Sequence, residues 1–339
     1  MNNNYKKILP IIAIIAIVII AAILWIPGNT TGQFIKTESG ESNSIRLGYT
    51  PLIHSLPIYI AIDKNYFTEQ GLIVEPVKFE SPNQMIDALM QGKLDFVTIG
   101  GPSGIVAVAD YKNPGKIKIF ALSGGYKENP NAVILVQPDS PIKSIEELKG
   151  KKFGILGGTI QWRTIARAIL AKHGLDMDKD LTVVELAPTQ QVAALAAKQI
   201  DALLALDPMA TVALDKNVGK IIVKSPLEDD ISDPIYAGAG SVNSEFAKNN
   251  PKTTQKFILA ITKAVGDIRT NQVEARTHLK NYTPLDDATI QKATMPSFLM
   301  CGEITNVDVA LLQKFLDIFT TYKVVEGKIN TRALLYCTN

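Results

Sequence analysis

The sequence predicts an α/β protein: two doubly wound α/β domains with a hinge and an interdomain cleft, preceded by one N-terminal transmembrane helix. Three observations support this prediction. Short apolar strand patterns alternate with helical patterns over much of the chain, which is typical of crossover units around a mainly parallel sheet. The length of 339 residues suits about two domains. A long apolar run stands near the N-terminus, at residues 8–26.

The composition excludes several classes of protein. Basic residues number 35 and acidic residues 33, so the net charge is only +2. A nucleic-acid-binding protein usually carries a basic surplus, and we therefore expect no nucleic-acid partner. Three His and two Cys are too few for a zinc framework or an iron–sulfur cluster. We expect no metal and no organic cofactor.

The apolar run at residues 8–26 contains no charge and is preceded by Lys6 and Lys7. Its 19 residues would nearly cross the roughly 30 Å hydrocarbon core of a bilayer as a helix. The two lysines predict a cytoplasmic start and an extracytoplasmic body. A cleaved signal peptide is the alternative, but its apolar region is usually shorter and ends at small residues. We favour an uncleaved signal anchor over residues 1–26; the first cysteine is Cys301, so no lipoprotein anchor is available.

Residues 27–44 predict a flexible tether, because eleven of these eighteen are Gly, Ser, Thr or Asn. The body that follows is expected to be extracytoplasmic, either periplasmic or at the cell surface, and held at the cell membrane. Its first α/β unit has strand patterns separated by helical patterns. The strands are expected at 45–49, 72–79, 94–99 and 117–122, and the helices at 57–70, 82–92 and 103–111.

A second α/β unit follows in the middle of the chain. Its strands are expected at 152–156, 181–186, 201–206 and 221–224, with helices at 159–173, at 189–199 and from Pro208. Ser144 and Glu147 predict a capping box for a short helix. After residue 241 the pattern becomes helical only, and we expect these helices to pack on the first unit. The predicted domains are residues 45–130 plus 235–339, and an inserted domain of residues 131–234.

Ligands of open α/β sheets bind beyond the carboxyl ends of the strands, so the loops there are the candidate site. The first such loop carries Thr50, His54 and Ser55 ahead of a helix, where free N–H groups favour an anion or a polar acceptor. The alternative is that Ser55 only caps the helix and His54 is solvated. The next loop offers Gly101 and Ser103, where glycines permit close backbone approach.

The second unit contributes two further loops. Gly157-Gly158 leads to Thr159, Gln161 and Trp162 at a helix start, which resembles an anion cradle. The alternative for Trp162 is packing, and for the Gly-Gly pair a tight turn. Asp207 ends the strand at 202–206 and is expected to bind a ligand amine, accept hydrogen bonds or hold the other domain; Asp before Pro is also a common helix start.

Catalytic signatures are missing from this body. It has no G-x-S-x-G elbow, no H-E-x-x-H and no His/Cys cluster at metal spacing. We therefore expect a binding protein and no enzyme. Cys301 and Cys337 are candidates for a disulfide, since an extracytoplasmic location permits one, although their spacing does not establish that they meet.

Residues 45–325 resemble the substrate-binding proteins of the nitrate/sulfonate/taurine class of ABC importers. The resemblance is carried in order by IRLGYTPLIHSLPIYIAIDKNYFTEQGLIVE, MIDALMQGKLDFVTIGGPS, SPIKSIEELKGKKFGILGGTIQWRTIARAILAKHGL, IDALLALDPMATVAL and SEFAKNNPKTTQKFILAITKA. It implies a type II periplasmic-binding-protein fold that closes on a small solute by hinge bending. The family's ligand positions correspond to Thr50, His54, Ser55, Gly101, Ser103, Thr159, Gln161, Trp162 and Asp207.

The resemblance implies a function as well. The body would capture a small anionic or polar solute of the nitrate, sulfonate or taurine type, act as a monomer, and deliver the solute to an ABC permease with its ATPase. Two alternatives stay open. One is an enzyme on the same fold, of the pyrimidine or menaquinone precursor type, and the other is a sensory ectodomain.

Overall fold

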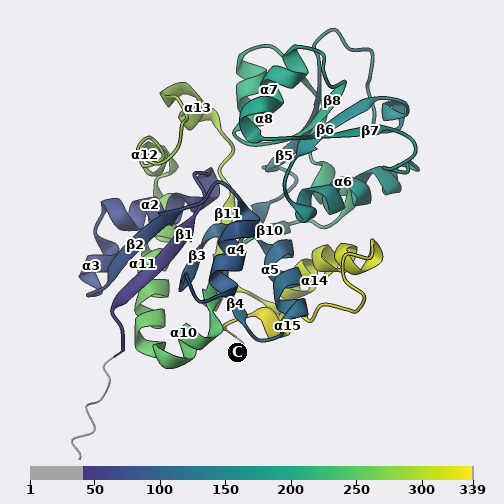
Figure 1. The fold of residues 1–339 in the computed structure, drawn as a ribbon. Coiled ribbons are helices and arrows are strands. Elements are labelled where there is room, and N and C mark those ends of the chain that lie inside the picture. The colour runs from purple at the N-terminus through teal and green to yellow at the C-terminus, as the bar shows by residue number, and fades with distance from the viewer. Residues whose placement is uncertain (1–40, 338–339) are drawn as a thin grey trace, which may run out of the picture. The chain divides into compact units, whose positions relative to one another are not determined.

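The computed structural model describes residues 41–337, and its strands form two separate sheets (Figure 1). The predicted signal anchor and most of the predicted tether lie outside the described residues. Within 41–337, no helix is long and apolar enough to cross a membrane.

The first sheet has six strands in the order β11-β4-β10-β3-β1-β2. Their bounds are β1 Ser44–Tyr49, β2 Ile73–Lys78, β3 Phe96–Pro102, β4 Ile117–Gly125, β10 Ile235–Asn243 and β11 Ser297–Met300. β1 runs parallel to β2 and β3, whereas β10 is antiparallel to both of its neighbours and β11 is antiparallel to β4. We call this sheet and the helices on it the first lobe.

The second sheet has five strands in the order β7-β6-β8-β5-β9. Their bounds are β5 Ala132–Val136, β6 Lys152–Leu156, β7 Thr182–Leu186, β8 Ala202–Leu206 and β9 Lys220–Val223. β6 runs parallel to β7 and β8, whereas β5 is antiparallel to β8 and β9. This sheet and its helices form the second lobe.

The expectation of mainly parallel sheets holds for most strands: β1 to β4 run in one direction in the first sheet, and all strands but β5 do so in the second, whereas β10, β11 and β5 run against them. The chain leaves the first sheet at the carboxyl end of β4 and returns to it at the start of β10. A strand that re-enters a sheet at the same end of the strands where the chain left it must run in the opposite direction. The same geometry applies to β5, which enters the second sheet from the crossing. The directions of β10 and β5 are therefore a consequence of inserting one lobe into the other.

The helices of the first lobe depart from the expected pattern in two places. Asn65 adopts a left-handed conformation (φ 59°), which divides the expected helix 57–70 into α2 Leu56–Asp63 and α3 Tyr66–Glu69. The expectation of helices only after residue 241 is wrong, because β11 extends the first sheet at its edge. The others are η2 Ile53–Ser55, α4 Pro82–Met90, α5 Ser103–Lys112, α10 Ser244–Asn249, α11 Pro251–Thr270, α12 Gln272–Thr277, α13 Asp287–Lys292, η4 Cys301–Glu303, α14 Asn306–Thr321 and α15 Thr331–Leu334.

The second lobe has helices on both faces of its sheet, with α6 on one face and α7 and α8 on the other (Figure 1). They are η3 Glu146–Leu148, α6 Ile160–Lys172, α7 Pro188–Ala196, α8 Met209–Asp215 and α9 Pro226–Asp230. The predicted capping box at Ser144 is wrong. The carboxylate of Glu147 instead accepts a hydrogen bond from the backbone N–H of Lys143 (2.8 Å), and the segment forms one 3-10 turn.

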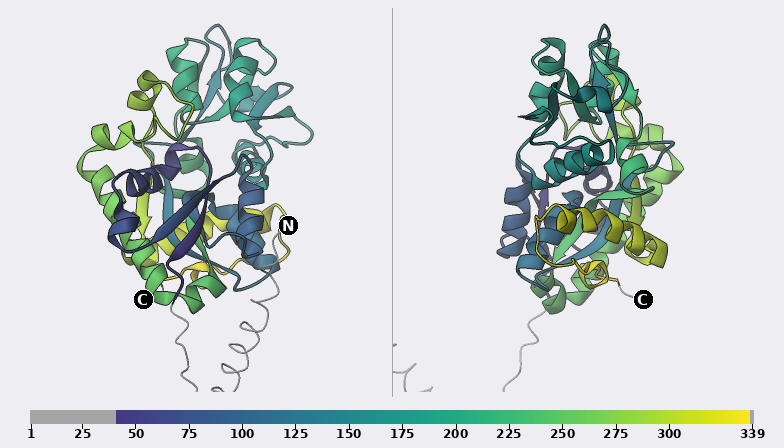
Figure 2. Two further views of the ribbon diagram at one scale, coloured as in Figure 1. Left: turned by 60° about the vertical axis from the view of Figure 1, so that its left-hand side comes forward. Right: turned by 90° about the vertical axis from the view of Figure 1, so that its right-hand side faces the viewer.

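The C-terminal helices pack on the first lobe, as expected. The apolar stripe of α11 places Phe257 against Phe96, with ring centroids 3.9 Å apart. Both rings are fully buried, and each such burial contributes about 2–3 kcal/mol. Helices α14 and α15 (yellow in Figure 2) lie against α5 and against β10 and β4. A disulfide joins Cys301 to Cys337, with their Cα atoms 5.5 Å apart, and so fastens the C-terminal segment to the same lobe.

Candidate functional site

Thr50 directly follows β1 and is 3% exposed. Its carbonyl oxygen accepts hydrogen bonds from the hydroxyls of Ser55 (2.8 Å) and Tyr59 (3.0 Å), which fixes the shape of the loop. Its own Oγ1 is buried and has no hydrogen-bond partner within residues 41–337. A buried hydroxyl without a partner costs about 1–3 kcal/mol. The Thr50 hydroxyl therefore keeps an unused hydrogen-bonding group, whereas the Ser55 hydroxyl serves the loop.

His54 lies in the same loop, and its Nδ1 is 3.2 Å from Oγ of Ser123, near the end of β4. The Ser123 hydroxyl donates to the carbonyl of Ile99 (3.0 Å). Because the hydroxyl has a single proton, this pattern assigns the imidazole proton to Nδ1 and leaves Nε2 as an acceptor. Burial lowers the pKa of His54 to about 4, against the opposing effect of the Asp207 carboxylate. The ring is therefore neutral at neutral pH.

Asp207 follows β8 in the second lobe and is shared between the lobes. Its Oδ1 accepts hydrogen bonds from the backbone N–H (3.2 Å) and the hydroxyl (2.6 Å) of Thr211. Its Oδ2 accepts one from the backbone N–H of Thr294, which follows α13 of the first lobe (3.2 Å). The carboxylate thus connects the two lobes and also acts electrostatically on His54.

Arg276 brings a cation to this region from α12. Its Nη1 donates to the carbonyls of Ile290 (3.0 Å) and Ala293 (2.5 Å). Burial lowers the pKa of the guanidinium, and the nearby carboxylate of Asp207 opposes that effect. Only Nη1 is engaged by these contacts, and a guanidinium carries five N–H donors in a planar fork. The side chain therefore keeps donors that suit an oxyanion.

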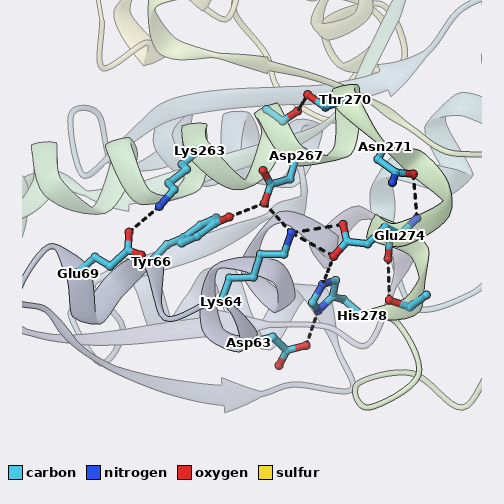
Figure 3. A network of polar contacts seen from close by, with 12 residues as sticks. Asp63, Lys64, Tyr66, Glu69, Lys263, Asp267, Thr270, Asn271, Glu274 and His278 are labelled. Atoms are coloured by element: carbon cyan, nitrogen blue, oxygen red, sulfur yellow. Dashed lines mark hydrogen bonds and ion pairs between the residues drawn. The ribbon is translucent and has the colours of Figure 1, made fainter.

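A polar network on the first lobe holds α12 in place (Figure 3). Lys64, at the end of α2, pairs with Asp267 of α11 (3.0 Å) and with Glu274 of α12 (3.1 Å). His278 bridges Asp63 (2.6 Å) and Glu274 (3.3 Å) through its two ring nitrogens. Glu274 belongs to the same helix as Arg276, so its contacts with Lys64 and His278 hold the helix that carries the guanidinium.

The loop that begins α6 serves as a connection between the lobes. The Thr159 hydroxyl caps the helix by accepting from the N–H of Trp162 (3.3 Å), and Trp162 is buried in the apolar core. Gln161 uses both ends of its amide across the lobes. Its Oε1 accepts from the N–H of Gly104 (2.8 Å), and its Nε2 donates to the carbonyl of Ala237 (3.0 Å). The N-terminus of α5 is therefore occupied by protein.

The glycine-rich segment at the end of β3 also makes contacts within the protein. The Ser103 hydroxyl donates to the carbonyl of Tyr236 (2.7 Å). A Cβ at Gly101 would lie 2.9 Å from the carbonyl oxygen of Ala239, so this position needs a glycine to let β10 approach. Of the nine predicted ligand residues, the structure places His54 close enough to Asp207 for the carboxylate to act on its pKa, and Thr50 lies in the loop that carries His54. The other six, Ser55, Gly101, Ser103, Thr159, Gln161 and Trp162, form contacts within the fold.

The two chain crossings between the lobes, at residues 126–131 and 231–234, lie beside a buried carboxyl group. Glu228 is 4% exposed, and neither of its oxygens has a hydrogen-bond partner among the described residues. Burial raises its pKa to about 7, and the charges of Asp233 and Asp229 add to that shift while Lys127 opposes it. Lys127 itself pairs with Asp229 (2.9 Å) and donates its backbone N–H to Asp233 (3.2 Å).

Sequence reasoning missed Arg276 and Glu228; it indicated Ser123 only as part of a weaker candidate loop at residues 123–126 and did not predict its contact with His54. Arg276 lies on a short helix far along the chain from the strand-end loops, and no local pattern distinguishes it from a solvated arginine. Ser123 lies one residue beyond the expected strand 117–122, and the signal for it was its place at a strand end. Glu228 has no sequence signal, because its burial depends on packing between α9 and Gly125.

Comparison with known families matches residues 38–279 to the NMT1-like family, over more than two thirds of the chain. The chain belongs to this family.

Individual proteins agree with the assignment to the NMT1-like family. A binding protein of Brucella abortus is 29% identical over 232 residues, 68% of each chain. A Bacillus subtilis protein named for binding aliphatic sulfonates is 24% identical and covers 93% of this chain and 92% of its own. A pyrimidine phosphate synthase of Saccharomyces cerevisiae is 24% identical over 70% of each chain. The crystal structure of the Escherichia coli periplasmic aliphatic sulphonate binding protein has the same fold, with a TM-score of 0.71, 21% identity, and coverage of 88% and 98%.

Proposed function

We propose that this protein is the extracytoplasmic solute-binding component of an ABC importer, and that its solute is a small polar anion. The observation that carries the proposal is the group of Thr50, His54, Asp207 and Arg276. Thr50 and Asp207 follow strands of different lobes. Within residues 41–337, the Thr50 hydroxyl has no hydrogen-bond partner and only Nη1 of Arg276 is engaged. The solute would complete these contacts and stabilise the closed arrangement of the lobes.

The charge of the site favours an oxyanion that also carries a hydrogen-bond donor. Arg276 offers N–H donors in a planar fork, which suits a sulfonate or nitrate group. His54 is neutral and presents an acceptor at Nε2, and Asp207 is negative. A solute that combines an anionic group with an N–H or O–H group fits this set. The sulfonate- and nitrate-binding names of relatives and structural neighbours support the same class.

Isothermal titration calorimetry of the purified protein tests the proposal. Alkanesulfonates, taurine, nitrate and a hydroxymethylpyrimidine are titrated separately, and we expect micromolar binding of at least one anionic solute. The Arg276→Gln variant should weaken that binding by roughly 10- to 150-fold, since a hydrogen bond to a charged group contributes about 1.5–3 kcal/mol. Lys198→Gln, an exposed second-lobe lysine, is the matched control and should bind normally. Binding that is unchanged in Arg276→Gln would contradict the assigned site.

The similarity to the yeast synthase makes an enzymatic activity the alternative to be tested. We propose that this chain converts none of the titrated solutes. Incubation of protein and solute, followed by mass spectrometry of the small molecules, should recover every solute unchanged. A product formed in proportion to protein concentration would favour the enzyme and count against the transport function.

The proposal includes the membrane and the transporter partners. Residues 1–26 would anchor the protein, residues 27–44 would tether it, and residues 131–234 would move as one body about the two crossings. The closed monomer would dock on the permease, which the ATPase drives. Fractionation of cells with an antibody to the body should place the chain in the membrane pellet. A shortened mature chain in the medium or soluble fraction would show that the leader is cleaved.

A further inference from the structure

A basic groove lies in the first lobe at the end of the sheet away from the candidate solute site. Its volume is about 790 Å³. It is lined by Lys118, Ser244, Ala247, Lys248, Asn330, Arg332, Ala333, Leu335 and Tyr336. Three of these nine residues are cationic and none is acidic. We call this feature the basic groove.

The basic groove is separate from the solute site. Lys118 is the second residue of β4, and Gly125 ends that strand next to the crossing. Seven residues of extended strand at roughly 3.3 Å each place the two ends about 23 Å apart. Ser244 follows the end of β10, which is antiparallel to β4, and so lies at the same far end. A partner in the groove would leave the solute site free.

One wall of the groove is held firmly by covalent and hydrogen bonds. The backbone N–H of Tyr336 donates to the carbonyl of Ile119 (2.8 Å), next to the bridge between Ile119 and Leu335. The Lys118 ammonium donates to the carbonyl of Ala333. Cys337, which follows Tyr336, is joined to Cys301 by a disulfide. The wall therefore belongs to the folded lobe and presents its charges at fixed positions.

The polar groups of the groove are open to an anion. Lys118, Lys248 and Arg332 form no ion pair with any acidic group of residues 41–337; Arg332 bonds only the neutral side chain of Asn306 (2.7 Å). The Ser244 hydroxyl is buried and has no partner among these residues. Three cations without an acidic partner suit a phosphate group, which carries several acceptor oxygens.

The point at which the described chain begins indicates the source of the phosphate that the groove would bind. The Glu41 carboxylate accepts from the N–H of Thr253 (2.9 Å), and the Ser42 N–H donates to Asn250 (2.8 Å). Asn250 is two residues from Lys248, so the forty residues that precede the described body join it beside the groove. Those residues include the apolar run predicted to enter the membrane. We infer that the basic groove binds the anionic headgroups of the bilayer in which the chain is anchored.

This inference uses the predicted anchor and is independent of the proposed solute. Attraction between basic residues and an anionic surface decays within a Debye length, about 8 Å at physiological salt. The predicted tether at residues 27–40 would span roughly 20 Å on average, so the groove beside the junction would often come within that range of the surface, whereas the solute site lies at the other end of the lobe. The groove would therefore orient the resting receptor on the membrane without blocking capture of solute.

Hydrogen exchange of the full-length chain in lipid nanodiscs tests the inference. Discs of phosphatidylcholine alone are compared with discs containing roughly one third phosphatidylglycerol, each at about 50 mM and about 500 mM salt. We expect residues 244–250 and 330–336 to exchange roughly tenfold more slowly in the anionic discs at low salt, and this protection to disappear at high salt. The Lys248→Glu/Arg332→Glu variant should lose the protection. Lys248→Gln/Arg332→Gln, which introduces no new charge, should lose most of it.

The control variant carries Lys179→Glu and Lys198→Glu, two exposed lysines of the second lobe, and should be protected like the parent chain. Equal exchange in both kinds of disc would overturn the inference. So would protection by inorganic phosphate in the neutral discs, because it would identify a site for a free anion. Solute titration of the same samples keeps the two proposals distinguishable, since the groove variants should bind solute normally.

Discussion

Gln161 and Gly104 are joined by a hydrogen bond of 2.8 Å although they begin helices in different lobes. The other end of the Gln161 amide donates to Ala237 of β10 (3.0 Å), so one side chain makes two contacts across the boundary. The side chain is 2% exposed, which shields both bonds from water. The residue expected to bind a ligand therefore holds the lobes together in the structure.

Replacing Gln161 by Ala should favour the open form of the protein. Two hydrogen bonds at about 1 kcal/mol each correspond to a shift of roughly 30-fold in the closed-to-open ratio. Small-angle scattering should show a larger radius of gyration without solute, and the affinity for solute should fall. Gln255→Ala, on the exposed side of α11, is the control and should scatter like the parent. An unchanged radius together with unchanged affinity would show that the amide does not set closure.

Replacing Thr50 by Val should stabilise the solute-free protein while weakening solute binding. The hydroxyl of Thr50 is buried and has no partner in the described part of the chain, so its removal relieves a cost of about 1 kcal/mol in the free protein. The same hydroxyl is expected to bond the solute, and its loss should raise the dissociation constant roughly tenfold. Thermal unfolding and calorimetry measure the two effects. Thr262 lies on the surface, and its hydroxyl donates to the carbonyl of Ile258; the Thr262→Val variant should change neither the solute affinity nor the increase in unfolding temperature on adding solute.

Glu228 should make stability fall as the pH rises. Its folded-state pKa of about 7 lies above the ordinary value of 4.5. Below about pH 4.5 the carboxyl is protonated in both the folded and unfolded states, and its contribution to stability is fully present. Between about 4.5 and 7 only the folded state keeps the proton, so the free energy of unfolding decreases until the folded pKa is passed.

The Glu228→Gln variant should remove this dependence and be more stable than the parent at pH 8, by about 3 kcal/mol. Urea unfolding at pH 5, 6.5 and 8 measures the difference, which should vanish toward the acidic end. Glu326→Gln, an exposed site, is the control. Parallel stability profiles for the parent and Glu228→Gln would contradict the assigned titration.

The disulfide between Cys301 and Cys337 should stabilise the first lobe without affecting solute binding. It closes a chain segment of 36 residues, for which the entropic contribution is about 2–4 kcal/mol. The Cys301→Ser/Cys337→Ser variant should unfold at a temperature several degrees lower, and reduction of the parent should reproduce that loss. Solute affinity measured well below the transition should be unchanged. An equal melting temperature with and without reductant would show that the bond adds no stability.

Much of this architecture follows from local patterns in the sequence. The alternation of strand and helix segments, the strand-end positions of Thr50, His54 and Asp207, and the apolar stripe of α11 each depend on residues close together in the chain. The hydrophobic periodicity and the residues that end helices and strands are sufficient to predict such features, because local backbone preferences and one-sided burial decide them. The apolar run at residues 8–26 is also readable in this way, and it stays a prediction.

Tertiary structure alone decided which polar groups remain free. Ser103 and Gln161 stand in loops that look like ligand cradles, but contacts from Tyr236 and Gly104, far away in sequence, use their hydrogen-bonding groups. Arg276 reaches the region of Asp207 only because packing brings α12 beside a loop of the other lobe. A sequence specifies which donors and acceptors exist. Their availability depends on long-range pairing, and burial makes every unpaired group costly enough for that pairing to be nearly complete.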